Sequence, residues 1–241
     1  MNSEELSGQV ALVSGGSGGI GGAVISALQQ AGALAVSLDV ARPADDRVPW
    51  VKGDVREDAE VAAGVEEIAK RHGRLDIVVH AAGITRDAVL WKLPLADWDL
   101  VHGVNLRGAF LLLRHAVPVM RRGSGGRVVL IGSINGSRGK FGLTAYASSK
   151  AGLLGLAKSA ARETARFGIR VNVVEPGMVR TPMTEALPPA VRQAAEAESL
   201  LGVLLEPEDV AATVLFLCGP GGSQITGQIL RVDAGQYLGG S

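Results

Sequence analysis

The chain has 241 residues, 47% of them hydrophobic and 33 of them glycine, which is enough for one large α/β domain or two small ones. Lys+Arg and Asp+Glu balance at 24 each, so the composition gives no reason to expect nucleic acid or an anionic membrane surface as a partner. The single cysteine, Cys218, cannot form an internal disulfide and is typical of a reducing compartment. Residues 1–9 lack the pattern of a signal peptide, and the apolar runs are too short to span a bilayer. We therefore expect a cytoplasmic protein without a membrane segment.

The first chemical motif along the chain is a glycine-rich turn at residues 14–21, between an apolar run at residues 10–13 and a helical pattern. Strand, glycine-rich turn and helix together place backbone N–H groups and a positive helix end against a pyrophosphate. A second strand, residues 34–38, ends on Asp39, 20 residues after Gly19, where a carboxylate accepts a hydrogen bond from an adenosine ribose. The motif predicts dinucleotide binding. The alternative is an ordinary turn before a helix, with Asp39 solvated at a strand end.

Strand and helix patterns then alternate to the end of the chain. We expect further strands at residues 48–52, 75–80, 127–132, 169–175 and 228–232, and helices at residues 23–31, 57–72, 98–121, 144–167 and 207–218. This alternation is typical of right-handed crossovers and of a parallel sheet that helices cover on both faces. No linker or shift in composition interrupts it, so we predict a single α/β domain, residues 1–241.

Several polar or glycine-containing segments follow directly after predicted strands. They are Asp54, Ser133, and the segments 81–83 and 176–181. Ligands of such sheets bind beyond the carboxyl ends of the strands, so these segments should gather on one rim beside the glycine-rich turn. A hydroxyl at Ser133 could donate a hydrogen bond there to the oxygen of a substrate carbonyl.

A phenol and an amine, Tyr146 and Lys150, stand one helical turn apart in the predicted helix of residues 144–167. Positions i and i+4 lie on the same face, so the ammonium could stabilise the phenolate and lower its pKa. Tyr146 could then exchange a proton with a substrate hydroxyl, although such a pair also occurs by chance in many helices. Asn105 is a poor helix former inside another predicted helix, which fits either a functional amide or a buried amide with satisfied hydrogen bonds.

Several of these residues, taken together, resemble the motifs of the short-chain dehydrogenase/reductase family. They are Gly15, Gly19, Gly21, Asn105, Ser133, Tyr146 and Lys150, and the resemblance covers about residues 10–237. It implies a doubly wound Rossmann fold, with a seven-stranded parallel sheet and helices on both faces, that assembles as a homotetramer. It also implies an NAD(P)-dependent oxidoreductase that acts on a ketone or a secondary alcohol.

The resemblance assigns a catalytic role to each of four residues. Tyr146 would be the general acid/base, and Ser133 would orient the substrate. Lys150 would lower the pKa of Tyr146 and hold the nicotinamide ribose, while Asn105 would support a water relay to that lysine. No metal is expected, because no histidine has metal-ligand spacing with a cysteine or a carboxylate.

The resemblance also implies a cofactor site. Residues 176–181 match the segment that contacts the nicotinamide carboxamide, and residues 54–55 match the pair beside the adenine. The full expected cofactor-binding set is Gly15, Ser17, Gly18, Gly19, Ile20, Gly21, Asp39, Asp54, Val55, Ala81, Ala82, Gly83, Tyr146, Lys150, Pro176, Gly177, Val179 and Thr181.

Within the family, residues 84–87, 171–174 and 225–227 are similar to bacterial 3-oxoacyl-[acyl-carrier-protein] reductases and acetoacetyl-CoA reductases. Those reductases usually prefer NADPH and carry an arginine where this chain has Gly18. Asp39 stands where they have a small or neutral residue. Because a carboxylate would repel a 2′-phosphate, we expect NAD(H) to be preferred over NADP(H).

A third departure from those reductases concerns the turn of residues 80–83. The family has Asn-Asn-Ala-Gly at this turn, and this chain has His80, Ala81, Ala82 and Gly83. The backbone role of the turn is retained, but an amide near the cofactor is lost.

Two substrate classes are open. We expect a 3-oxoacyl thioester. The alternative is a free secondary alcohol such as a hydroxysteroid, a cyclic alcohol or a sugar derivative. A remote alternative is that the chain is a non-catalytic nucleotide-binding protein. Acyl-carrier protein is strongly acidic, and Arg121, Arg122 and Arg127 could offer it a basic rim, while Arg166 and Arg170 flank another candidate edge. Phe167, however, falls where carrier-protein reductases often have a basic residue, so carrier docking is also open.

Residues 184–206 are expected to cover the substrate. Their apolar side chains either form a substrate pocket or pack on the sheet: Leu187, Val191, Leu200, Leu201, Val203, Leu204 and Leu205. The segment also has an excess of acidic side chains over the single Arg192, namely Glu185, Glu196, Glu198 and Glu206. Such a surround would disfavour an anionic carrier.

Overall fold

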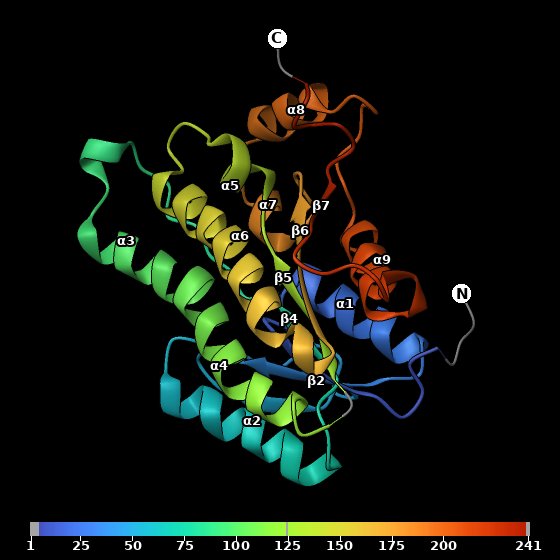
Figure 1. Ribbon diagram of the computed structural model, residues 1–241. Coiled ribbons are helices and arrows are strands. Elements are labelled where there is room, and N and C mark those ends of the chain that lie inside the picture. Colours follow the sequence, from blue (N-terminus) through green and yellow to red (C-terminus); the bar gives the residue numbers. More distant parts are fainter. Residues whose placement is uncertain (1–4, 124, 240–241) are drawn as a thin grey trace.

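The computed structural model describes residues 5–123 and 125–239, and within them seven strands form one parallel sheet (Figure 1). The strand order is β3-β2-β1-β4-β5-β6-β7. The strands are β1 (Val10–Ser14), β2 (Leu34–Asp39), β3 (Trp50–Lys52), β4 (Ile77–His80), β5 (Gly126–Ile131), β6 (Ile169–Pro176) and β7 (Ile229–Val232). β1 and β4 are buried along their whole length, as short apolar runs in a covered parallel sheet should be. The predicted doubly wound Rossmann sheet is confirmed.

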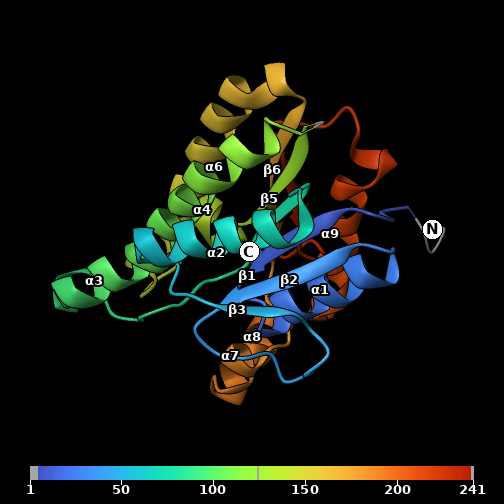
Figure 2. The ribbon, with the colours of Figure 1, turned by 90° about the horizontal axis from the view of Figure 1, so that it is seen from below.

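Helices cover both faces of this sheet (Figure 2). One face carries α2 (Asp58–His72), α4 (Gly108–Met120) and α6 (Thr144–Thr164), and the other carries α1 (Gly19–Gln30) and α9 (Pro207–Cys218). Successive side chains of β1 alternate between the two cores, because neighbouring residues of a strand point to opposite faces. Among the described residues, no helix is both long enough and apolar enough to cross a bilayer.

The sheet has a switch point beside β1. This strand pairs with β2 on one side and with β4 on the other, so the chain leaves it toward opposite edges of the sheet. Loops that follow two such strands diverge to different faces and leave a crevice at the carboxyl ends. The glycine-rich turn after β1 therefore lies at the position where this fold binds ligands.

The part of the chain that connects β4 to β5 contains a long helical run, which crosses one face of the sheet (Figure 1). It begins with α3 (Leu95–His102), passes through a π-helical segment, Gly103–Arg107, and continues directly into α4. The sequence predicted one helical region over residues 98–121 and did not predict the π-helical segment. Such segments are rare and often lie at functional sites, and this one contains Asn105.

Three short helices near the carboxyl ends of the strands were not predicted: α5 (Ile134–Arg138), α7 (Pro182–Glu185) and α8 (Pro189–Glu198). They are too short for a helical period to be visible in the sequence. Their caps explain where two of them begin. The Ser133 hydroxyl accepts a hydrogen bond from the backbone N–H of Asn135 at 3.2 Å, and Thr181 and Thr184 form a reciprocal capping box.

Candidate active site

A cavity of about 390 Å³ opens at the carboxyl ends of the strands. Its walls come from the turn after β1, the loops after β4, β5 and β6, and the starts of α6 and α7. The predicted site residues that line it are Gly15, Ser17, Gly18, Gly19, Ile20, Gly21, Ala81, Gly83, Ser133, Tyr146, Lys150, Pro176, Gly177, Val179 and Thr181. The predicted nucleotide turn and the predicted acid/base pair therefore share one cavity.

The turn after β1 approaches neighbouring backbone too closely to accept side chains at two positions. Gly15 has a φ of +73°, and a Cβ there would lie 2.5 Å from the backbone N of Ala82. A Cβ on Gly21 would overlap the carbonyl oxygen of Gly15. α1 begins at Gly19, after the N-cap Gly18, and has no acidic side chain in its first turn. Backbone N–H groups and the positive helix end are thus available at the cavity, which fits a pyrophosphate.

Asp39, the last residue of β2, lies against this turn. Its Oδ2 accepts a hydrogen bond from the backbone N–H of Ser17 at 3.1 Å, and its Oδ1 accepts one from the backbone N–H of Ala41 at 3.1 Å. Asp39 is not part of the cavity wall, but its carboxylate is hydrogen-bonded to Ser17, which is. A negative charge is therefore held next to the turn that fits the cofactor phosphates.

α6 presents Tyr146 and Lys150 to the same cavity. Lys150 is 3% exposed, and its Nζ lies 5.8 Å from the centroid of the Tyr146 ring. The same Nζ donates a hydrogen bond to the carbonyl oxygen of Ile131 at 2.7 Å. Ser133, the buried N-cap residue of α5, lines the same cavity, and its hydroxyl is close enough to the Tyr146 phenol to lower the pKa of that phenol. A hydroxyl and a phenol thus meet in the cavity close to a buried ammonium.

Burial and neighbouring groups shift the pKa of Tyr146. Burial raises it, the nearby hydroxyl of Ser133 offsets part of the rise, and the negative charge of Asp87 adds to it. Tyr146 keeps some solvent exposure along the cavity, so solvent screens part of these effects. Burial also lowers the pKa of Lys150 to about 8. In this structure the Lys150 ammonium donates to Ile131, and burial is the largest influence on the pKa of Tyr146; a lowering of that pKa by Lys150 stays a prediction.

Asn105 is fully buried, and protein groups satisfy its side-chain amide. Its Oδ1 accepts a hydrogen bond from the backbone N–H of Ile84 at 2.9 Å. Its Nδ2 donates to the Ile84 carbonyl oxygen and to Ser149 Oγ, both at 3.0 Å. The amide therefore ties the loop after β4 to α6, one residue before Lys150. The side chain matches the alternative of a satisfied buried amide, and its part in a water relay stays a prediction.

Besides Asp39, three predicted cofactor residues lie outside the cavity wall. Asp54 pairs with Arg56 at 2.6 Å, and this hydrogen-bonded pair lowers the pKa of Asp54. Val55 is 6% exposed and packs closely on Gly108. A Cβ added to Gly108 would lie 2.9 Å from Val55 Cγ2. Ala82 supports the glycine-rich turn from behind. The contact of residues 54–55 with an adenine stays a prediction.

The apolar residues of the segment 184–206 divide between the two expected locations. Leu187 lines the cavity, together with the polar Thr184. Leu204 and Leu205 are buried, and Leu205 packs in the core on the α1 and α9 face. Others remain exposed, namely Val191, Leu200, Leu201 and Val203. Leu187 therefore has the position of a pocket residue and Leu205 packs on the sheet, while the four exposed residues do neither; that the segment forms a substrate pocket stays a prediction.

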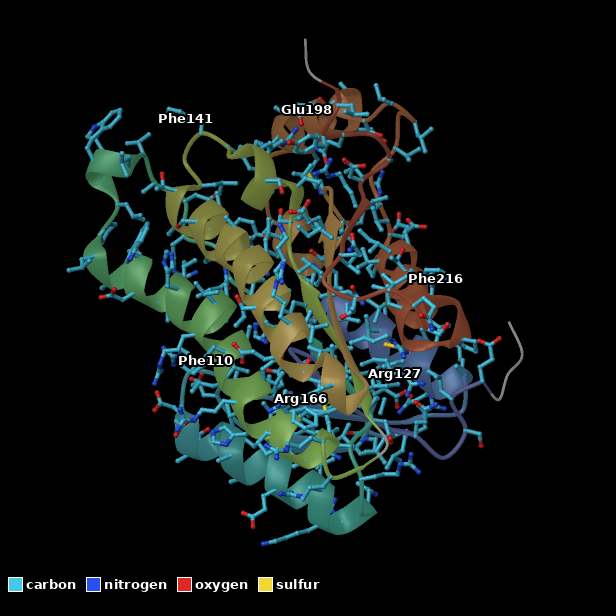
Figure 3. The ribbon with its side chains drawn as sticks, in the orientation of Figure 1. Phe110, Arg127, Phe141, Arg166, Glu198 and Phe216 are labelled. Atoms are coloured by element: carbon cyan, nitrogen blue, oxygen red, sulfur yellow. The ribbon has the colours of Figure 1, made fainter. Side chains whose placement is uncertain are left out.

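Most of the acidic side chains of this segment have cationic partners. Glu198 pairs with Arg138 of α5 at 2.9 Å and lies at the same end of the molecule as Phe141 (Figure 3). Arg180 pairs with Glu196 at 3.5 Å and with Glu206 at 3.2 Å. The acidic excess predicted around the substrate is thus partly neutralised by arginines from α5 and from the loop after β6.

Sequence reasoning missed several cavity residues, among them Asn135, Lys140, Leu143, Met183 and Gln236. They lie on α5, on the loop before α6, on α7 and near the end of the described chain. The capping residues Ser133 and Thr181 were the available signals for α5 and α7. Gln236 has no local signal, because only the tertiary fold brings it to the cavity, where its Oε1 accepts from the backbone N–H of Met178 at 2.8 Å.

Comparison with known proteins agrees with this geometry. A family model described as "Enoyl-(Acyl carrier protein) reductase" matches residues 15–236. The chain belongs to the short-chain dehydrogenase/reductase family. The resemblance found in the sequence is confirmed, and the chain is an oxidoreductase of a family that uses NAD(P)(H) and acts on CH–OH donors.

Three members of this family illustrate the similarity. A 3-oxoacyl-[acyl-carrier-protein] reductase of Thermotoga maritima is 38% identical over 244 residues, which cover 97% of this chain and 99% of that protein. A cis-4-hydroxycyclohexanecarboxylate dehydrogenase of Sinomonas cyclohexanicum is 38% identical over 243 residues, 96% of this chain and 98% of that protein. The crystal structure of gox2181 superposes with a TM-score of 0.92 at 31% identity and covers 97% of both chains. The similarity therefore extends over nearly the whole of each protein.

Lys150 is expected to lower the stability of the fold at neutral pH. Its pKa is about 8 in the folded chain, against about 10.4 for a solvated lysine, so the folded state binds this proton more weakly than the unfolded state does. The destabilisation is fully present below about pH 8 and is relieved as the pH rises from about 8 to about 10.4. Lys150→Met should therefore raise the free energy of unfolding at pH 7 by about 1–3 kcal/mol while turnover is lost.

Urea unfolding at pH 7 and pH 9 measures this effect. Lys158→Met is a matched control, because Lys158 is exposed on the same helix and should change stability by less than about 0.5 kcal/mol. A Lys150→Met protein that is less stable than the wild type at pH 7 would contradict the expectation.

Proposed function

We propose that this chain reduces the 3-keto group of an acyl thioester with NADH and forms the 3-hydroxyacyl thioester. The observation that carries the proposal is that Ser133, Tyr146 and Lys150 meet in the cavity that also holds the glycine-rich turn. Similarity over almost the full length to a 3-oxoacyl-[acyl-carrier-protein] reductase supports this substrate class.

The predicted catalytic residues are suited to a reduction. Nicotinamide, when bound, supplies the hydride that reduces the carbonyl carbon. Ser133 would donate a hydrogen bond to the ketone oxygen and hold it beside Tyr146. The raised pKa of Tyr146 keeps the phenol protonated at neutral pH, so it can donate its proton to that oxygen. The ammonium of Lys150 would then stabilise the phenolate that is left, and Asn105 would hold α6 in place through Ser149.

We infer that NADH is preferred over NADPH. The carboxylate of Asp39 is fixed by the N–H groups of Ser17 and Ala41 beside the phosphate-binding turn. A 2′-phosphate would meet this negative charge, and Gly18 offers no cation to compensate it. A ribose 2′-hydroxyl could instead donate a hydrogen bond to the same carboxylate.

We further propose that residues 184–206 cover the bound substrate. Thr184 and Leu187 already line the cavity. The ion pair between Glu198 and Arg138 joins α8 to α5, so the cover is attached to the helix that Ser133 caps.

Coenzyme A is the carrier that we propose for the acyl group. The guanidinium carbons of Arg121 and Arg166 lie 4.8 and 4.7 Å from the ring centroid of Phe167. Arg127 and Arg166 lie at the end of the molecule opposite to Phe141 and Glu198 (Figure 3). An acyl-carrier protein that docked on Arg121, Arg127 and Arg166 would not face the cavity of the same chain.

A second candidate function is the oxidation of a free secondary alcohol. It is favoured by the similarity to cis-4-hydroxycyclohexanecarboxylate dehydrogenase, which is as high as the similarity to the 3-oxoacyl reductase. The same cavity groups would serve the reaction in reverse, because Tyr146 would accept the proton that it donates in the reduction.

A substrate panel separates the candidates. We expect acetoacetyl-CoA to be reduced with NADH at a kcat/KM at least about tenfold above that of 4-oxocyclohexanecarboxylate, and above that of an acetoacetyl carrier-protein thioester. The opposite ranking would favour the alcohol dehydrogenase, and a faster carrier-protein thioester would overturn the choice of coenzyme A. NADH binding without turnover of any panel member would indicate a non-catalytic protein.

We propose a homotetramer in the cytoplasm. The faces around residues 106–119 and 153–161 are the expected subunit contacts, and Phe110 on α4 is 46% exposed. Phe216 on α9 is 42% exposed on the opposite flank (Figure 3). The buried free thiol of Cys218 suits a reducing compartment.

Sedimentation velocity measures the assembly. We expect a species of four 24.8 kDa chains, and Phe110→Glu should reduce its mass because a buried charge disfavours an apolar contact. Phe141→Glu, at a position that is 86% exposed in the loop before α6, should leave the mass unchanged. A wild-type protein that is a stable monomer would refute the proposed assembly.

A further inference from the structure

His80, the last residue of β4, is a buried polar side chain that the proposed reaction does not use. It is 0% exposed. Its register partner on β1 is Ser14, and Ser14 Oγ lies 2.8 Å from His80 Nδ1. Ser14 is also 0% exposed and immediately precedes Gly15. One side of the imidazole is therefore bonded to the residue from which the cofactor turn begins.

The other ring nitrogen, Nε2, is buried as well, and no described residue forms a hydrogen bond of good geometry with it. The backbone of Val104 and Asn105 in the π-helical segment lies close enough to favour a protonated ring. Burial and, after it, the positive charge of Lys150 outweigh this effect and lower the pKa of His80 to about 3. The imidazole is therefore neutral at physiological pH.

A neutral imidazole has one N–H group, and its surroundings decide which nitrogen carries the hydrogen. Hydrogen on Nε2 is the tautomer that suits the nearby backbone of Val104 and Asn105, because this backbone favours a protonated ring. Nδ1 then accepts a hydrogen bond from the Ser14 hydroxyl. In this tautomer the ring extends from the end of β1 to the π-helical segment.

We propose that His80 is a positioning residue that bridges the start of the cofactor turn and the π-helical segment, and thereby sets where the cofactor lies relative to Tyr146. The connection continues to α6 through Asn105, whose Nδ2 donates to Ser149 Oγ at 3.0 Å. This inference rests on the proposed reduction, because it assigns His80 to the same site. A reacting group displaced by about 1 Å can lose on the order of 10²-fold in rate.

Three substitutions separate the contacts of the imidazole. His80→Phe keeps a ring in the buried space and removes both polar contacts. His80→Gln places an amide near the position of Nε2 and keeps a donor toward the π-helical segment. His80→Asn places an amide near Ser14 but is too short to reach that segment. His72→Phe, at the end of α2, is the control for a histidine away from the cavity.

Steady-state kinetics and NADH titration, at a temperature where each variant is folded by circular dichroism, test the inference. We expect kcat of His80→Phe to fall about 10- to 100-fold, while the KM of the ketone and the Kd of NADH change by less than about fivefold. His80→Gln should recover at least about tenfold of this loss, and His80→Asn should not. His72→Phe should keep the kcat of the wild type.

Two results would overturn the inference. One is a kcat of His80→Phe within threefold of the wild type, and the other is a loss of kcat that His80→Gln and His80→Asn share equally. If His80→Phe does not fold, the test uses the kcat of His80→Gln divided by the kcat of His80→Asn. We expect a ratio of about ten, and a ratio near one would contradict the inference. If the proposed substrate class is wrong, the wild-type protein itself will not reduce acetoacetyl-CoA. The His80 variants are then compared with the wild type on whichever panel substrate the wild type converts.

Discussion

Tyr146→Phe is expected to lower kcat for the reduction of acetoacetyl-CoA by about 10²- to 10⁴-fold, the usual contribution of a positioned proton donor. The substitution removes one oxygen and keeps the ring beside Lys150. The glycine-rich turn is unchanged, so the Kd of NADH should stay close to that of the wild type. Stopped-flow measurement of NADH oxidation, together with a fluorescence titration of NADH binding, separates the two effects.

The chain offers a matched control, because Tyr237 is its other tyrosine. The ring of Tyr237 lies 3.5 Å from the guanidinium carbon of Arg231, and the residue does not line the cavity. Tyr237→Phe keeps this cation–π contact and should leave kcat unchanged. Undiminished turnover of Tyr146→Phe would remove Tyr146 from the proposed chemistry.

Asp39→Asn is expected to shift the cofactor preference toward NADPH by about 10- to 100-fold in the ratio of the two Kd values, which corresponds to about 1.4–2.8 kcal/mol. The asparagine oxygen can still accept the hydrogen bond from Ser17 or from Ala41, so the turn keeps one of its supports. What is lost is the negative charge that would face a 2′-phosphate. Titration of both cofactors into both proteins gives the ratio directly.

Asp46→Asn is the control for this shift, since Asp46 forms an exposed ion pair with Arg42. The salt dependence of the ratio adds a second readout, because a like-charge contact weakens as ionic strength rises. A wild-type protein that binds NADPH more tightly than NADH would contradict the assignment of Asp39 as the selective residue.

The strand and helix pattern was predictable because each strand has a short apolar run and each long helix has a visible period. β1, β4 and α9 were found within one or two residues of their predicted bounds. The order of the strands also follows from general rules for crossover connections, once the glycine-rich turn identifies the first unit. The position of Ser133 and Tyr146 at the carboxyl ends of the sheet was a consequence of that order.

The electrostatics of the site could not be predicted in the same way. The i, i+4 spacing placed Tyr146 and Lys150 on one face, but it carried no information on Ile131, whose carbonyl oxygen binds the ammonium. The burial that raises the pKa of Tyr146 depends on residues that meet only in the folded chain. The π-helical segment and the hydrogen bond between Ser14 and His80 are likewise tertiary features. Local patterns thus predicted many of the residues that share the cavity, and packing decided their protonation and orientation.

The most direct test of the proposed reaction follows the hydrogen that is transferred from nicotinamide C4 to the substrate. Acetoacetyl-CoA is incubated with the wild-type protein and NADH deuterated at nicotinamide C4, and the product is analysed by mass spectrometry. We expect a 3-hydroxybutyryl thioester that carries one deuterium at C3 when the transferred face is labelled, and no such product from Tyr146→Phe on the same timescale. Recovery of unreduced acetoacetyl-CoA, or of a reduced product that never contains deuterium from either face, would contradict the proposed reaction.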